Sequence, residues 1–303
     1  MCSELFFEKE IKIKTKCIFD CYKIKQAKCM KKTKLLTASL FIIVLSSFTT
    51  LQAKTNMENP KTSIKEENVR YMLDTLHMKG FVAYNSSTVN KRPIVLVIPE
   101  WWGINDYARS RAKQLAELGY LAMAIDVYGN GTIAEDPTTA GQMAGPFYQN
   151  PQLAKARFEA ALAKIKTYAM ADTTKIAIIG YCFGGGMALN IARLGENLRG
   201  VVSFHGSLMG VPVDKKTLKA DILVCHGEDD KFVKAEEVAS FKKSLDEIGV
   251  KYTFKSYPNA THAFTNPNAT EKGKKYNMPI AYNAAADVAS FNEMKLFLTK
   301  VFK

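Results

Sequence analysis

From about residue 69 onward, short apolar runs alternate with longer segments of helical periodicity. The apolar runs are rich in β-branched residues, which favours strands. The first two strand-like segments are more polar than the others, as expected for an antiparallel edge of a sheet. In this way the pattern predicts eight strands, over residues 69–73, 80–84, 94–99, 121–126, 175–180, 200–205, 221–226 and 251–257.

Helices are predicted between the strands, where apolar residues recur at steps of three and four. The series Val238, Phe241, Leu245 and Ile248 is one example. Strands that alternate with helices build a mostly parallel sheet with helices on both faces. We therefore predict one α/β domain over residues 69–303. Its predicted helices cover residues 105–118, 151–169, 183–193, 234–248 and 283–301.

The segment 175–189 contains the strongest single motif of the chain. Ile176–Ile179 form a short apolar run that suits a buried strand, and a helix-compatible run begins a few residues later. Between them, Gly180 and Gly184 flank Cys182. Small residues on both sides permit the tight strand-to-helix turn that lifts a nucleophile out of a sheet. The motif predicts that Cys182 occupies the position of the serine in a nucleophile elbow.

Two other interpretations of this glycine-rich segment compete with a nucleophile elbow. A dinucleotide-binding loop would need glycine where Cys182 stands and an acidic residue about 20 positions further on, but Val201–His205 lie there. A buried structural cysteine is the second alternative, since cysteine is often buried for packing alone. The rest of the chain has to distinguish this alternative from a nucleophile.

Candidate reactive residues follow the ends of several predicted strands. Ligand sites in parallel sheets form beyond the carboxyl ends of the strands. Glu100 follows the strand 94–99, Cys182 follows 175–180, Asp230 follows 221–226, and His262 follows 251–257. The chain order nucleophile, acid, histidine is that of an α/β-hydrolase triad. The order favours a catalytic role for Cys182.

The chemistry of a thiol explains why these residue types occur together. A free thiol is only slightly ionised near neutral pH, so Cys182 needs a base, which His262 can supply. A carboxylate behind the imidazole would fix its tautomer, and the spacing Gly227, Asp230, Val233 favours Asp230 over Asp229.

The remaining site residues are expected around this triad. The backbone N–H groups of Phe183 and Trp101 are the predicted donors to an oxyanion. Trp102 and His205 are predicted to line the substrate pocket, although the two tryptophans could equally cap the core. Residues 128–150, rich in Gly, Pro and Thr, are a predicted pocket rim.

The N-terminal region has the layout of a secretory signal peptide. Residues 30–53 contain a basic segment, a short apolar run and a small residue at a plausible cleavage point. We expect translation to start at Met30, residues 1–29 to be an extension upstream of that start, and residues 54–68 to be a linker. The expected location is the periplasm or the exterior, with no stable membrane span after cleavage. An uncut membrane anchor is the alternative.

Charge and cysteine content narrow the choice of partners. The whole chain has a formal net charge of +13, but residues 1–53 hold ten of its 42 basic and four of its 29 acidic residues. The remaining excess of seven is spread along the chain without a block of like charges, which argues against nucleic-acid binding. Only Cys182 and Cys225 lie outside residues 1–53, so no disulfide framework is expected.

Four motifs together resemble the dienelactone hydrolase family of the α/β-hydrolase superfamily. They are residues 97–105 (VIPEWWGIN), 180–186 (GYCFGGG), 229–233 (DDKFV) and 261–264 (THAF). The resemblance implies an α/β-hydrolase fold and a role for Glu100 in holding the resting thiol and exchanging partners when substrate arrives. It also implies an arginine that binds the substrate carboxylate in dienelactone-cleaving members, where this chain has Asn266. Activity on dienelactone itself is therefore in question.

The sequence thus predicts a hydrolase that cleaves a small ester or lactone through a Cys182 thioester. No metal ion or organic cofactor is expected, and a monomer is favoured. A general carboxylesterase or acyl transferase on the same triad is the alternative within enzymes. A non-catalytic binding protein of the same fold is the alternative from another class, because fold alone does not establish activity.

Overall fold

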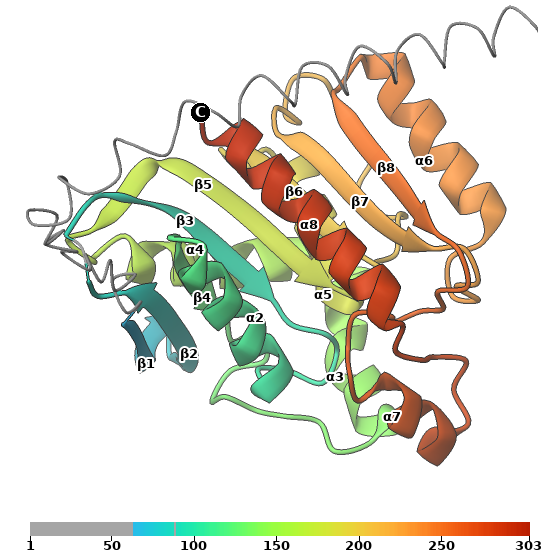
Figure 1. Cartoon of the computed structure of the whole chain (residues 1–303), viewed down its shortest axis with the longest axis horizontal. Coiled ribbons are helices and arrows are strands. Elements are labelled where there is room, and N and C mark those ends of the chain that lie inside the picture. Colours follow the sequence, from blue (N-terminus) through green and yellow to red (C-terminus); the bar gives the residue numbers. More distant parts are fainter. Residues whose placement is uncertain (1–62, 88) are drawn as a thin grey trace, which may run out of the picture. The chain divides into compact units, whose positions relative to one another are not determined.

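The computed structural model describes residues 63–87 and 89–303 (Figure 1). The predicted upstream extension, signal peptide and most of the predicted linker lie outside these residues. The described chain forms one eight-stranded sheet in the order β1-β2-β4-β3-β5-β6-β7-β8. The strands are β1 (Ile64–Leu73), β2 (Leu76–Asn85), β3 (Arg92–Ile98), β4 (Leu121–Ala124), β5 (Ala171–Tyr181), β6 (Gly200–Phe204), β7 (Asp221–Gly227) and β8 (Tyr252–Tyr257).

The sheet has the predicted mixture of strand directions. β1 pairs with β2 and β2 with β4 in antiparallel fashion, and every other neighbouring pair is parallel. The first two strands are the more polar ones, as the sequence pattern indicated. β1 begins at Ile64 and pairs there with Asn85, so the domain starts inside the stretch 54–68 that was predicted as a linker.

Helices cover both faces of the sheet, as predicted. Along β3, Ile94 and Leu96 face a core that includes Phe158 of α4, while Val95 and Val97 face a second core with Met294 of α8. This alternation reflects the two-residue period of a strand. The helices are α2 (Asp106–Glu117), α3 (Pro137–Gln149), α4 (Pro151–Ile165), α5 (Phe183–Arg193), α6 (Ala235–Ile248), α7 (Ala269–Tyr276) and α8 (Ala284–Val301).

Two of these helices, α3 and α7, were not predicted. Helix α3 carries glycines and Pro146, which obscure its periodicity, although Asp136 caps its start and Pro137 follows at the first turn. Helix α7 is short and polar and buries only Ala269 and Gly273. In the described part of the chain, no helix has the length and apolar character needed to cross a bilayer.

The turn between β5 and α5 depends on close backbone packing. A Cβ atom on Gly180 would lie 1.9 Å from the carbonyl oxygen of Gly184, and one on Gly184 would lie 2.4 Å from that of Ile98. Cys182, between them, has φ 54° and ψ −118°. A non-glycine residue in this region is strained, and such strain is typical of functional sites. The strand-turn-helix motif read from the sequence is therefore present.

This packing predicts opposite effects for two glycine-to-alanine substitutions. Gly184→Ala should lower the free energy of unfolding by about 1–3 kcal/mol, because its methyl group meets the fixed end of β3. Gly141→Ala is the matched control, since a methyl group on Gly141 in α3 would have no heavy atom within 4 Å. It should be neutral or stabilise by about 0.5–1 kcal/mol. Urea unfolding would measure both, and equal stabilities would contradict the close approach.

Candidate active site

Cys182, His262 and Asp230 form one hydrogen-bonded chain at the carboxyl edge of the sheet. The Cys182 sulfur lies 2.9 Å from Nε2 of His262, and Nδ1 of His262 lies 2.8 Å from Oδ2 of Asp230. Cys182 directly follows β5, Asp230 follows β7, and His262 lies in the loop after β8. Residues 80 positions apart in the sequence are therefore in direct contact. Asp229, the rejected alternative, is exposed, whereas Asp230 is buried.

The surroundings of His262 favour its protonated form. Burial alone lowers the pKa of an imidazole, but the adjacent Cys182 and the hydrogen bond to Asp230 raise the pKa of His262 well above its usual range. Asp230 is itself held in place, because its Oδ1 accepts a hydrogen bond of 2.8 Å from the N–H of Phe232. The arrangement can take a proton from the thiol and keep it on the imidazole.

A cavity of about 250 Å³ opens over the sulfur of Cys182. Its walls include both tryptophans, Trp101 and Trp102, whose rings lie edge to face at 5.3 Å. The tryptophans thus border the cavity, and Trp102 also stacks on Tyr276 of α7. Tyr148, at the end of α3, supplies a further wall from the segment that was predicted as a rim.

The two residues predicted to provide oxyanion donors also border this cavity. Phe183 begins α5 directly after Cys182, and its ring packs against Tyr148 at 5.6 Å. The Trp101 loop is fixed by two hydrogen bonds. The carbonyl of Trp101 accepts from the Tyr128 hydroxyl at 2.8 Å, and the N–H of Gly103 donates to the Glu100 carbonyl at 3.1 Å.

Comparison with known proteins identifies the family. The model of the dienelactone hydrolase family matches residues 78–302. The chain belongs to this family. Among its relatives, Protein usf of Aquifex pyrophilus is 30% identical over 180 residues, which cover 57% of this chain and 77% of the relative. A protein of Aquifex aeolicus provisionally named carboxymethylenebutenolidase is 29% identical over 179 residues, again 57% and 77% of the two chains.

A solved structure supports the same assignment. It is described as a dienelactone hydrolase-like promiscuous phosphotriesterase from metagenomic libraries. It is 30% identical to this chain and superposes with a TM-score of 0.74, covering 80% of this chain and 100% of the other. The α/β-hydrolase fold predicted from the sequence is therefore confirmed.

Glu100, which the family resemblance assigned to the resting thiol, is bonded elsewhere in this dienelactone hydrolase family member. It borders the cavity together with Cys182, is 3% exposed, and accepts a hydrogen bond of 2.6 Å from Nδ2 of Asn266. Burial raises the pKa of Glu100, and the Asn266 hydrogen bond and the charge of Lys272 oppose this shift. The thiol, meanwhile, is bonded to His262.

Asn266, which takes the place of the arginine found in dienelactone-cleaving members, does not line the cavity. Asn266 is buried behind Glu100 and accepts a hydrogen bond of 3.0 Å from the N–H of Asn268. Among the described residues that line the cavity, none is lysine or arginine. Lys272 of α7 lies 3.9 Å above the ring of Trp102, outside the lining. The cavity wall therefore offers a substrate carboxylate no lysine or arginine as a partner.

The prediction that His205 lines the substrate pocket is wrong. His205 is 1% exposed and lies beneath the elbow, where its Nδ1 accepts a hydrogen bond of 3.1 Å from the N–H of Cys182. Its φ of 41° turns the side chain under Cys182 at the end of β6. Burial lowers the pKa of His205 well below its usual range, so the ring is neutral.

Two residues that the sequence did not single out complete this buried chain. Because Nδ1 of His205 accepts, its Nε2 carries the proton and donates to the Thr265 hydroxyl at 2.7 Å. The same hydroxyl is 2.6 Å from that of Tyr107 on α2. Thr265 comes shortly after His262 in the same loop, so the chain connects the elbow to the histidine loop. No local signal marked Thr265 or Tyr107.

The described part of the chain contains no cluster of three or more His, Cys, Asp or Glu side chains that could hold a metal ion. Met278 and Ile280, which follow α7, are further cavity walls that the sequence analysis missed. They come from a segment whose position only the tertiary structure fixes.

The burial of Glu100 predicts a stability change on Glu100→Gln. Because the pKa of Glu100 is raised in the folded protein, the folded chain binds more protons than the unfolded chain between the two pKa values. Stability therefore falls as the pH rises through that window. Glutamine keeps the acceptor for Asn266 and has no charge to bury, so the variant should be more stable at neutral pH.

The melting temperature is the measurement, followed from about pH 4 to about pH 8. We expect Glu100→Gln to gain a few degrees at neutral pH, since about 1 kcal/mol corresponds to about 2–4 °C in a chain of this size. The gain should disappear below the ordinary glutamate pKa of about 4.3. Glu271→Gln, on an exposed residue of α7, is the control and should leave the pH dependence unchanged. A pH-independent effect of Glu100→Gln would contradict the buried charge.

Proposed function

We propose that this chain hydrolyses small esters or lactones through a thioester at Cys182. The observation that carries the proposal is the chain of contacts from the sulfur through His262 to Asp230, with heavy-atom distances of 2.9 and 2.8 Å. These distances lie within the range for nucleophile activation by a base. Membership in the dienelactone hydrolase family supports the same class of reaction.

The proposed reaction begins with transfer of the thiol proton from Cys182 to Nε2 of His262. The thiolate attacks the substrate carbonyl carbon, and the resulting oxyanion accepts hydrogen bonds from the N–H groups of Phe183 and Trp101. When the intermediate collapses, the C–O bond breaks and His262 protonates the departing alkoxide. Water then attacks the thioester with His262 as base, which releases the acid and restores the thiol.

Asp230 acts in this mechanism through the imidazole. A carboxylate on Nδ1 keeps the proton there, so that Nε2 is free to accept the thiol proton. It also stabilises the imidazolium that forms during each half of the reaction. The burial of Asp230 and its bond from the Phe232 N–H support this role, since they hold the carboxylate in one orientation.

Glu100 is proposed to control the state of the thiol. Burial raises the pKa of Glu100 and so favours its neutral form, and a neutral carboxyl would not repel the oxyanion that develops beside it. If Glu100 exchanged its hydrogen bond from Asn266 for one with the Cys182 thiol, it would control the activation of that thiol.

Labelling of Cys182 by iodoacetamide against pH should differ between wild type and Glu100→Gln, and identical profiles would remove this role.

The proposed substrates carry small, uncharged acyl groups. The cavity volume of about 250 Å³ and its aromatic walls favour a small acyl group. Without a lysine or arginine in the cavity wall, a substrate carboxylate would be poorly compensated. A carboxylesterase and an acyl transferase share these first steps, and they differ in whether water or an alcohol receives the acyl group.

The test of the proposed function is direct detection of the acyl-enzyme. Purified protein is mixed with a short-chain aryl ester, quenched in acid and analysed by mass spectrometry. We expect an acyl adduct on the peptide that contains Cys182, together with turnover that Cys182→Ala abolishes. Cys225→Ala is the control, because Cys225 is buried in the core away from the cavity. Absence of both the adduct and turnover across esters and lactones would favour the non-catalytic binding protein.

If Asp230 is the acid of the triad, substitutions of the adjacent Asp230 and Asp229 should have different effects on activity. Asp230→Asn should lower kcat by roughly 10²- to 10⁴-fold, because the imidazole loses the partner that fixes its tautomer. Asp229→Asn is the matched control and should change kcat little, since Asp229 is exposed and the bond to His262 comes from Asp230. Steady-state kinetics on one activated ester would compare them. A larger loss in Asp229→Asn would show that Asp230 is the wrong acid.

A further inference from the structure

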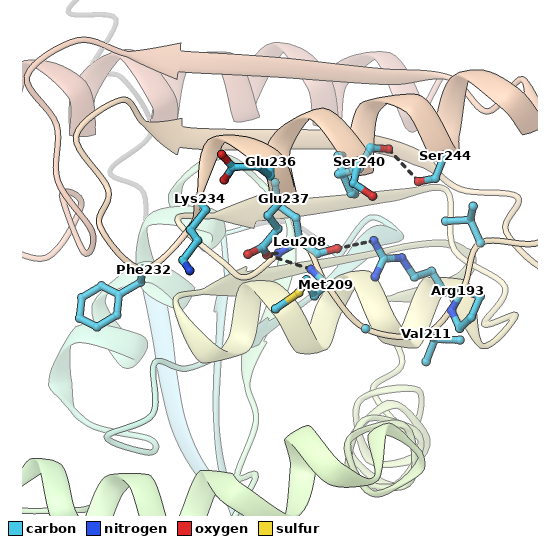
Figure 2. Close-up of a pocket in the computed structure, with 14 residues that line it drawn as sticks. Arg193, Leu208, Met209, Val211, Phe232, Lys234, Glu236, Glu237, Ser240 and Ser244 are labelled. Atoms are coloured by element: carbon cyan, nitrogen blue, oxygen red, sulfur yellow. Dashed lines mark hydrogen bonds between the residues drawn. The ribbon is translucent and has the colours of Figure 1, made fainter.

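A second, larger hollow lies beside the catalytic cavity. This groove has a volume of about 810 Å³ and lies between helix α6 and the loop that follows Ser207 (Figure 2). Figure 2 shows Ser240 and Ser244 on the helix side and Met209 and Val211 on the loop side. The mechanism proposed above uses none of these four side chains.

The groove and the catalytic cavity share a boundary. Phe232 lines both of them, and its ring lies 4.9 Å from that of His262. Along the chain, Ser207 lines the catalytic cavity and the next residue, Leu208, lines the groove. A ligand that starts at the sulfur of Cys182 can therefore extend past Phe232 into the groove.

The lining of the groove suits an apolar ligand. Seven of its fourteen lining residues are Leu, Met, Val, Pro or Phe. Two of them, Met209 and Phe232, are 69% and 52% exposed, which is unusual for large apolar residues. Exposed apolar side chains that gather on one concave surface mark a binding site. Charged groups, Lys234 and Glu236, belong to the same lining.

The walls of the groove are preformed. Oε1 of Glu237, in the first turn of α6, accepts hydrogen bonds from the Ser207 hydroxyl at 3.0 Å and from the N–H groups of Leu208 and Met209 at 2.5 and 3.0 Å. Arg193 donates to the carbonyl of Leu208 at 2.8 Å. A ligand would therefore bind without the cost of ordering this loop.

The position of Phe232 decides which part of an ester would enter the groove. In the proposed reaction, His262 protonates the leaving alkoxide, so the alcohol portion lies next to His262. Phe232 is the side chain that separates His262 from the groove. The acyl portion then stays in the catalytic cavity, whose walls include Trp101 and Trp102.

We infer that the groove binds the alcohol portion of the ester, so that preferred substrates combine a small acyl group with an extended, mostly apolar alcohol. This inference rests on the proposed function and specifies its substrate class. The acyl group remains limited by the small catalytic cavity, while the alcohol chain lies between α6 and the loop after Ser207.

Two ester series test this inference. The first keeps the acetyl group and lengthens the alcohol from ethyl to octyl, and the second keeps the ethyl group and lengthens the acyl chain over the same range. We expect kcat/KM to rise about two- to fourfold per methylene in the first series, as for burial of a methylene in an apolar site. In the second series kcat/KM should fall. Each ester is used below the concentration at which it aggregates.

A tryptophan substitution tests whether the rise of kcat/KM with alcohol length arises in the groove. Ser240→Trp fills the groove from α6, so the ratio of kcat/KM for octyl acetate to that for ethyl acetate should fall close to one. Lys243→Trp is the matched control on the same helix, because Lys243 is exposed and does not line the groove. It should keep the wild-type ratio. Melting temperatures of both variants confirm that each is folded.

The outcomes separate this inference from the proposed function. Hydrolysis of ethyl acetate with acylation of Cys182, but with no rise along the alcohol series, would overturn the groove assignment and leave the proposed function intact. An equal rise in both series, or a rise that Ser240→Trp retains, would also overturn it. Absence of turnover and of an acyl-enzyme with every ester would overturn both.

Discussion

The close passage of the N-terminus of α5 over the ends of β3 and β5 is the constraint on which the site depends. Gly184 lies against the carbonyl of Ile98, and no side chain fits between them. This contact holds Cys182 at φ 54°, a conformation that a free chain would rarely adopt. It also places the start of α5, whose N–H groups favour negative charge, next to the Glu100 and Trp101 loop. Cys182 and the proposed oxyanion donors are thus positioned by one backbone contact.

Beneath Cys182, a series of buried, hydrogen-bonded side chains connects parts of the site that lie far apart in the sequence. His205 contacts the N–H of Cys182 and the hydroxyl of Thr265, which in turn meets Tyr107. Hydrogen bonds in a low-dielectric interior are strong when every member is satisfied. The chain connects the elbow to the loop of His262, whose Nε2 lies 2.9 Å from the sulfur.

Both burial and neighbouring charged or hydrogen-bonded groups determine which charge states the site favours. Cys182 and Asp230 together favour a charged His262, whereas burial favours a neutral Glu100 and a neutral His205. His262, Glu100 and His205 lie within one site, and their favoured charge states differ because their nearest partners differ. In the proposed mechanism, a neutral Glu100 would avoid the repulsion that a charged residue beside the oxyanion would cause. In the proposed function, the apolar walls of the cavity would also limit the acyl group, while the groove beyond Phe232 would take the other half of the substrate.

The sheet, five of the described helices and the proposed triad could be predicted from the sequence. These follow from local periodicity and from the rule that parallel strands end at one edge, which brings Cys182, Asp230 and His262 together whatever the details of packing. The orientation of the side chains at that edge, in contrast, depends on contacts in the folded protein. The positive φ of His205 turns it under the elbow, and Asn266 meets Glu100 across 166 residues. Helices α3 and α7 lack a clear apolar periodicity, and their placement depends on the other elements they pack against. Orientation and long-range contact depend on the whole folded chain, and no local pattern encodes them.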